Sequence, residues 1–104
     1  MVLDKGLIIS DDAIEFNLKR LTNQIYKLLP SREEGLEWCK PLETIIEELY
    51  GMSNIGLGQD RIFFSLICKL QGLFALTAQE DFLLFRRTIF ECLRLINDIK
   101  QEVL

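Results

Sequence analysis

Apolar side chains recur every three or four residues along most of the chain, the spacing that places them on one face of an α-helix. In the first such segment the steps between them are four, three, four and three, at Ile14, Leu18, Leu21, Ile25 and Leu28. Capping side chains precede this stripe at Ser10, Asp11 and Asp12, and Glu15 completes a capping box with Asp12. The pattern predicts a first helix that begins near Asp12 and ends at Pro30, because proline lacks the backbone donor that continues a helix.

A second helical pattern runs from Ser31 to Tyr50 and contains a proline. Residues 31–34 form another possible capping box. Six apolar residues are placed to face inward, namely Leu36, Cys39, Leu42, Ile45, Ile46 and Leu49. Pro41 predicts either a kinked helix or a short turn followed by a helix with Pro41 at its first position. We favour the second interpretation.

The second half of the chain predicts a loop and two more helices. Residues 51–58 hold three of the six glycines and predict a connecting loop, with no phosphate-binding spacing. A nearly all-apolar helix is predicted from Asp60 to Leu76. A capping box at residues 77–80 predicts a final helix from Ala78 to Glu102. The inward stripe of that helix is Phe82, Phe85, Ile89, Cys92, Ile96, Ile99 and Val103.

These segments together predict an all-α fold. No window alternates apolar and polar residues strictly, and 104 residues fit one domain, here residues 1–104. With short connections, four helices predict an antiparallel four-helix bundle whose second helix is broken or kinked near Pro41. Residues 1–9 are expected to form a short N-terminal arm. They would also suit a segment from within a longer polypeptide, and that alternative stays open.

The composition argues against catalysis. The chain has no histidine, which is the commonest general base and metal ligand near neutral pH. Glu43 and Glu47 share a helix face, but bundle metal sites also use Glu-x-x-His pairs, so we expect a solvated acidic face. Cys39 beside Lys40 could be an activated thiol, yet no imidazole can serve as its base. We therefore predict a non-enzyme with no catalytic residue, cofactor, metal or small-molecule substrate.

Cysteine usage and the N-terminus bear on location. Cys39, Cys68 and Cys92 are far apart among apolar neighbours, which predicts buried free thiols in a reducing compartment. The first residues lack the features of a signal peptide, and no stretch has the roughly 20 apolar residues of a membrane span. The expected location is the cytoplasm, with no membrane contact.

Two helices carry aromatic and basic residues away from their inward stripes. On the last helix Leu83 and Phe90 lie off the stripe near Arg87 and Arg94, a composition typical of interface centres. These four residues are the predicted protein interface, although a stray exposed aromatic is an open alternative. On the first helix Phe16 also points away from the stripe. Its neighbours on that face are Arg20, Asn23 and Lys27.

The third helix has more apolar surface than one packed face needs. Its main polar stripe is Arg61, Ser65 and Lys69, which leaves more than half of the circumference apolar. The excess is covered by residues 1–9, by another protein chain, or by the bundle itself if this is a fully covered core helix.

Two main hypotheses follow for function. In the first, the chain is a non-catalytic subunit that docks its third and fourth helices on copies of itself or on a larger protein partner. In the second, it belongs to a ribonucleoprotein and contacts phosphates, with Phe16 or Phe90 beside a sugar or base. The phosphate-binding candidates are Arg20, Lys27, Arg86, Arg87, Arg94 and Lys100. In size and helical class alone, the chain is similar to the small all-helical subunits of CRISPR effector complexes.

The charge distribution adds a third possibility. The net charge is −4, and residues 31–50 account for all of it, with six acids and two bases. The other ten acids and ten bases cancel. A glutamate-rich face of this kind could also lie in a basic groove as a nucleic-acid mimic, and such polarity favours oriented docking in an assembly.

Overall fold

The computed structural model describes residues 11–54 and 60–103. Within those residues the chain forms helices and no strands, which confirms the all-α prediction. The predicted arm at residues 1–9 and the second half of the predicted loop at 51–58 lie outside the described residues. The elements are α1 (Asp11–Glu33), α2 (Cys39–Asn54), α3 (Asp60–Gly72), the 3₁₀ turns η1 (Leu73–Ala75) and η2 (Gln79–Asp81), and α4 (Phe82–Val103).

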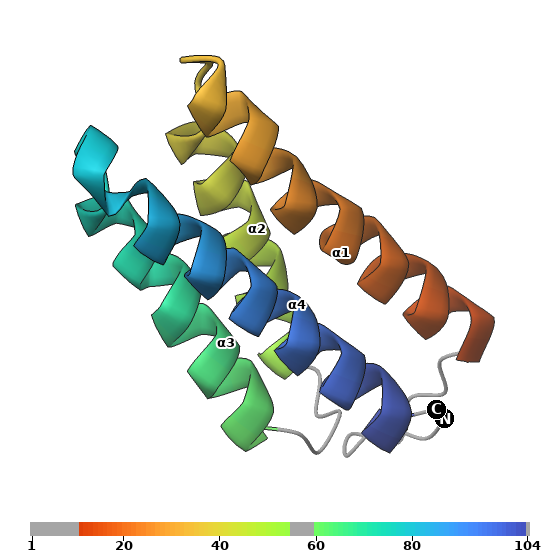
Figure 1. The fold of residues 1–104 in the computed structure, drawn as a ribbon. Helices are drawn as coiled ribbons and strands as arrows, with labels where there is room; N and C mark the ends of the chain where they lie inside the picture. The colour runs from red at the N-terminus through yellow and green to blue at the C-terminus, as the bar shows by residue number, and fades with distance from the viewer. Residues whose placement is uncertain (1–10, 55–59, 104) are drawn as a thin grey trace.

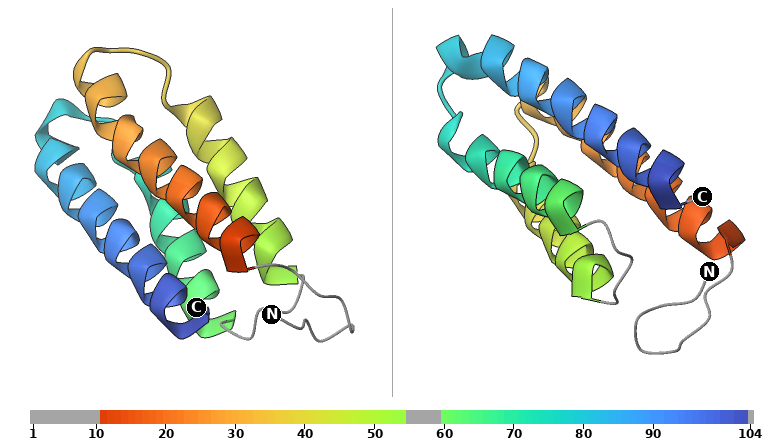
Figure 2. Two further views of the ribbon diagram at one scale, coloured as in Figure 1. Left: turned by 90° about the vertical axis from the view of Figure 1, so that its right-hand side faces the viewer. Right: turned by 90° about the horizontal axis from the view of Figure 1, so that it is seen from below.

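The four α-helices lie side by side, and consecutive helices run in opposite directions (Figure 1). Each helix packs against its neighbour in the chain, and α1 also packs against α4, so the helices form a closed ring (Figure 2). In this ring α2 lies across the core from α4. The connections from α1 to α2 and from α3 to α4 are at the same end.

The core consists of one apolar stripe from each helix, as helical periodicity predicts. All five predicted residues of α1 are buried, and α3 contributes Phe63, Leu66, Ile67 and Leu70. The buried residues of α2 are Leu42, Ile45, Ile46 and Leu49, and those of α4 are Phe85, Ile89, Cys92, Ile96 and Ile99. No polar or charged residue of the described chain is buried.

The first helix does not end at Pro30, contrary to the prediction. Pro30 lies inside α1, which continues to Glu33. The backbone then closes with two bonds typical of a helix C-terminus, from Leu36 N–H to the Ser31 carbonyl (2.8 Å) and from Gly35 N–H to the Arg32 carbonyl (3.2 Å). Gly35 has φ +73°, which glycine adopts without strain. Residues 31–34 therefore end α1 and do not cap a second helix.

The second helix begins at Cys39, two residues before the predicted start at Pro41, and ends later than predicted. Glu37 accepts hydrogen bonds from the backbone N–H groups of Cys39 (2.8 Å) and Lys40 (3.2 Å), which fixes the start of α2 at Cys39. Pro41 is thus the third residue, where a missing backbone donor costs little. Because the chain is still in a turn at Leu36, that side chain is exposed and not inward as predicted. At the other end, α2 includes residues 51–54, which the glycine content had suggested were loop.

The third and fourth helices are also offset from their predicted ends. α3 ends at Gly72 and continues as a 3₁₀ turn, whereas the prediction extended the helix to Leu76. α4 begins at Phe82 and not at Ala78, because residues 79–81 form the 3₁₀ turn η2. Ala78 before that turn is extended (φ −72°, ψ 150°) and has no side-chain cap. The predicted capping box at 77–80 does not form. Hydrogen bonds from Arg32 of α1, described below, hold this connection instead.

Candidate docking surface

The outer face of α4 carries the four residues predicted as a protein interface. Leu83 is 76% exposed and Phe90 is 44% exposed, so both point away from the core as expected. Arg87 and Arg94 are exposed on the same helix. Leu84, which periodicity did not single out, is also exposed. Three of the eight large apolar side chains exposed in the described chain therefore belong to α4.

Phe90 is the centre of an aromatic and basic patch. The guanidinium carbon of Arg86 lies 5.5 Å from the centre of its ring, within the range of a cation–π contact. Phe90, Arg87 and Arg94 also line a shallow concavity of about 540 Å³, together with Lys69, Glu91 and Leu95. The structure thus brings together three of the four predicted interface residues. We call Arg86, Arg87, Phe90 and Arg94 the arginine patch.

Glu91 neutralises part of the positive charge in this patch. Its carboxylate accepts a hydrogen bond from Lys69 Nζ (2.7 Å) and lies 3.3 Å from Arg87 Nε. The bond and charge of Lys69 lower the pKa of Glu91, and Arg87 and Arg94 lower it further. Arg94 makes no ion pair with any described residue, so its charge remains available to a partner.

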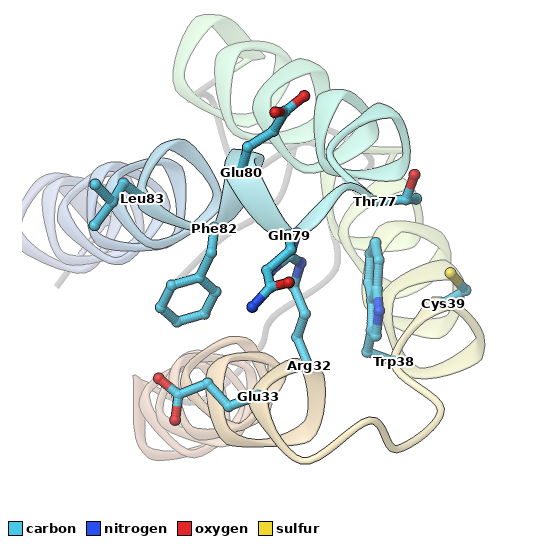
Figure 3. A pocket seen from close by; sticks show the side chains of 9 residues that line it. All are labelled: Arg32, Glu33, Trp38, Cys39, Thr77, Gln79, Glu80, Phe82 and Leu83. Atoms are coloured by element: carbon cyan, nitrogen blue, oxygen red, sulfur yellow. The ribbon is translucent and has the colours of Figure 1, made fainter.

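Leu83 belongs to a different concavity, at the end of the bundle where the two connections meet. This end pocket has a volume of about 800 Å³ and opens to solvent (Figure 3). Its lining comes from α1, the α1–α2 connection, the start of α2, the α3–α4 connection and α4: Arg32, Glu33, Trp38, Cys39, Thr77, Gln79, Glu80, Phe82 and Leu83. Predicted interface residues therefore border two concavities that follow one another along α4.

Arg32 holds the wall of the end pocket together. It donates to the Leu76 carbonyl through Nε (3.2 Å) and Nη2 (2.8 Å), and to the Ala78 carbonyl through Nη2 (2.7 Å). Its guanidinium carbon also lies 5.3 Å and 4.8 Å from the ring centres of Phe82 and Phe85. The guanidinium of Arg32 therefore binds groups of its own chain, and these contacts position the connection that leads into α4.

An edge-on contact between Trp38 and Phe85 extends this packing toward α2. Their ring centres are 5.1 Å apart and the rings are nearly perpendicular, at 79°. In Figure 3 Trp38 stands on the α2 side of the pocket and Phe82 on the α4 side, with Arg32 between them. Two aromatic rings, those of Trp38 and Phe82, therefore face each other across the end pocket.

The rim of the end pocket is acidic. Glu33 and Glu80 line it, are exposed, and have no ion-pair partner among the described residues. In Figure 3 Phe82 lies between these two side chains. Over the two segments that build this end, residues 32–43 and 76–83, there are six acids and two bases, a balance of −4. Because Arg32 is engaged internally, the end presents an acidic surface.

The bases proposed to contact phosphates are not gathered on one face. Arg20 pairs with Glu48 of α2 (2.9 Å), and Lys100 pairs with Glu15 of α1 (3.4 Å). Arg87 pairs with Glu91, so three of the six candidates already contact a carboxylate. Lys27 is exposed on α1, beside a shallow concavity that also contains Phe16 and Arg20. Arg86 and Arg94 stay on α4.

The remaining candidate groups do not form a chemical site. Glu43 and Glu47 are exposed, as expected of a solvated acidic face. Burial raises the pKa of the Cys39 thiol, and the carboxylates of Glu37 and Glu43 raise it further. In the described part of the chain, no three carboxylates or thiols are placed to hold a metal ion together.

The other two cysteines differ from each other. Burial raises the pKa of Cys92 to about 12, as the prediction of buried thiols implies. Cys68 instead lies exposed on α3, so that part of the prediction is wrong. The cause is the wide apolar surface of α3, which also leaves Phe64 70% exposed. The excess apolar surface of this helix is thus open to solvent at Phe64.

Among the described helices, none combines the length and apolar character needed to cross a bilayer. Comparison with protein-family models, with curated proteins and with solved structures finds no match to this chain.

Proposed function

We propose that the chain is an antiparallel four-helix bundle that acts as a non-catalytic subunit and docks on protein through the outer face of α4. The observation that carries this proposal is the exposure of Leu83, Leu84 and Phe90 on one helix, beside Arg94, which makes no ion pair with a described residue. Aromatic, aliphatic and arginine side chains in one patch are typical of the centre of a protein interface. The three free cysteines support a reducing compartment, the cytoplasm, as the place where it acts.

Several observations favour protein over nucleic acid as the partner. A phosphate-binding surface needs bases that are free to replace counterions. Here Arg20, Arg87 and Lys100 pair with carboxylates, and the candidates are spread over α1 and α4. The acidic end pocket adjoins α4 and would repel a phosphate backbone. We keep the ribonucleoprotein hypothesis as an outcome of the test.

The test is site-specific photo-crosslinking in the cell that naturally makes the protein. A photoreactive amino acid at Phe90 on α4 should yield a covalent adduct with protein, while the same group at Glu47 on α2 should yield little. Mass spectrometry identifies the adduct. Adducts with RNA or DNA at Phe90 would overturn the proposal in favour of the ribonucleoprotein, and equal yields at both sites would overturn docking through α4.

A second measurement uses truncation of the anchor. Phe90→Ala should leave the helical circular dichroism and the unfolding midpoint close to wild type, because Phe90 lies outside the core. Association with the partner should weaken by about 2 kcal/mol or more, as for an interface anchor. Unfolding of this variant would show that Phe90 contributes to the core.

A further inference from the structure

We propose that the partner on α4 is a second copy of this chain, paired through α4 about a two-fold axis close to Arg87. In this dimer Phe90 and Arg94 of each copy enter the end pocket of the other. The inference rests on the proposed docking function and names its partner. Three observations support it. They are the charge distribution along α4, the side chains that line the end pocket, and the sequence positions of Glu80, Leu83, Phe90 and Arg94.

The outer side of α4 is electrically polarised along its length. Its N-terminal end adjoins Glu33 and Glu80, whereas Arg87 and Arg94 lie further along the helix. Two copies of such a face in parallel would place like charges together. Two copies in antiparallel orientation place the acidic end of each against the basic stretch of the other, which favours one orientation of approach.

The acidic and basic parts of the α4 face are spaced so that one two-fold axis can bring them together in both directions. In an antiparallel pair, residues whose numbers have the same sum lie opposite one another. Leu83 and Phe90, both in α4, sum to 173. Glu80, in the η2 turn just before α4, and Arg94 sum to 174. One axis near residue 87 therefore brings the apolar pair together twice and places Glu80 of each copy near Arg94 of the other.

Arg86 and Arg87 lie nearest the axis, so these residues of the two copies would approach one another there. Arg87 already has Glu91 at 3.3 Å on its own helix, and the guanidinium carbon of Arg86 lies 5.5 Å from the centre of the Phe90 ring. The Lys69–Glu91 contact lies on the α3 side of α4 and keeps that carboxylate in place. The two Glu91 carboxylates therefore offset part of the positive charge at the axis.

The end pocket has the chemistry to receive an aromatic ring and a guanidinium. Trp38 and Phe82 supply aromatic walls, and Glu33 and Glu80 supply carboxylates without ion-pair partners among the described residues. Its volume of about 800 Å³ leaves room for both groups, and its opening to solvent lets them approach. Mutual insertion gives a self-complementary two-fold interface. Both end pockets of the dimer are then filled, so association stops at two copies.

Charge exchange tests this dimer directly. Arg94→Glu and Glu80→Arg should each weaken self-association about tenfold or more, because each variant creates like-charge contacts at both ends of the interface. An equimolar mixture of the two should form a heterodimer, since in that pair both contacts again join opposite charges. The chain carrying both substitutions should dimerise with itself as wild type does. Sedimentation velocity measures association, and native mass spectrometry separates heterodimer from homodimers.

Controls keep the result interpretable. Glu47→Arg on α2 changes the charge equally but lies across the bundle, so it should leave the dimer intact. Circular dichroism checks that each variant is folded. If Glu80→Arg fails to fold, Glu33→Arg tests the same rim.

Three results would overturn the dimer. They are a monomeric wild type at all concentrations, a loss of association in Glu47→Arg equal to that in Arg94→Glu, and a mixture that fails to recover association. A monomer that still yields a protein adduct from Phe90 would overturn the second copy while leaving docking through α4 in place. A monomer without such an adduct would overturn both.

Discussion

The outer faces of α4 and α2 differ, although both helices pack an apolar inner face into the core. Both helices bury an unbroken stripe of apolar residues at helical spacing. Outside, α4 exposes Leu83 and Phe90 next to arginines, whereas α2 exposes Glu43 and Glu47. The inner stripes explain why each helix folds onto the bundle. The outer faces are not needed for folding, so their difference indicates what the molecule contacts.

The largest expected effect comes from the inner stripes, where the two helices should behave alike. Ile89→Ala and Ile96→Ala on α4, and Ile45→Ala on α2, each remove buried methyl groups and leave a cavity. We expect each to lower the free energy of unfolding by about 2–5 kcal/mol, measured by urea denaturation. Leu83→Ala is the outward control and should stay within about 0.5 kcal/mol of wild type. Equal effects inside and outside would contradict the division of the helix into two faces.

A smaller effect is expected where the two helices begin. The start of α4 depends on Arg32, a residue of another helix, and the start of α2 depends on the nearby Glu37. Arg32→Gln should cost about 2 kcal/mol, since it removes charged hydrogen bonds to two carbonyls. Glu37→Ala should cost about 1 kcal/mol, as for loss of a helix cap.

Thermal unfolding of both variants, with Arg32→Lys as a control, checks this difference. A lysine keeps the charge but lacks the fork that reaches two carbonyls, so it should not restore full stability. Full stability in Arg32→Lys would show that charge alone is sufficient.

The smallest expected effect is a pH dependence of the free energy of unfolding that arises from Glu91 on α4. The pKa of Glu91 in the folded chain lies below its ordinary value of 4.5, chiefly because Lys69 donates a hydrogen bond to it. The resulting stabilisation is present above the unfolded pKa and is lost as the pH falls through the folded pKa. Urea denaturation between about pH 6 and pH 3 should therefore show wild type and Glu91→Gln converging toward acid. A difference that is constant with pH would contradict this assignment.

Local patterns in the sequence were sufficient for the core and for the outward residues of α4. Helical spacing depends only on neighbouring residues, so it predicted the buried stripes and the exposure of Leu83 and Phe90. It did not predict that Leu36 and Phe64 would be exposed, because that depends on where a turn ends and on how many helices surround α3. Whether an apolar residue is covered is a property of the whole assembly.

The helix ends were predicted wrongly, and the end pocket could not be predicted from local patterns. Arg32 resembled part of a capping box in the sequence, yet it sits in the last turn of α1 and binds carbonyls 44 and 46 residues away. A basic residue shortly before Gly35 is a signal for a helix end, and it could have placed the boundary correctly. Glu33 and Glu80 are separated widely in the chain, and the packing of α1 against α4 together with the contacts of Arg32 brings them to one rim.

The contacts of Arg32 also have a consequence for the order in which the molecule assembles. The side chain of Ala78 makes no capping hydrogen bond to the η2 turn that leads into α4, so this segment depends on the bonds that Arg32 donates to it. That support arrives only when α1 is already helical and lies alongside the α3–α4 connection. The first turn of α4 is therefore expected to become ordered late in folding, after the first helix has found the last one, and to be the first part of α4 to open.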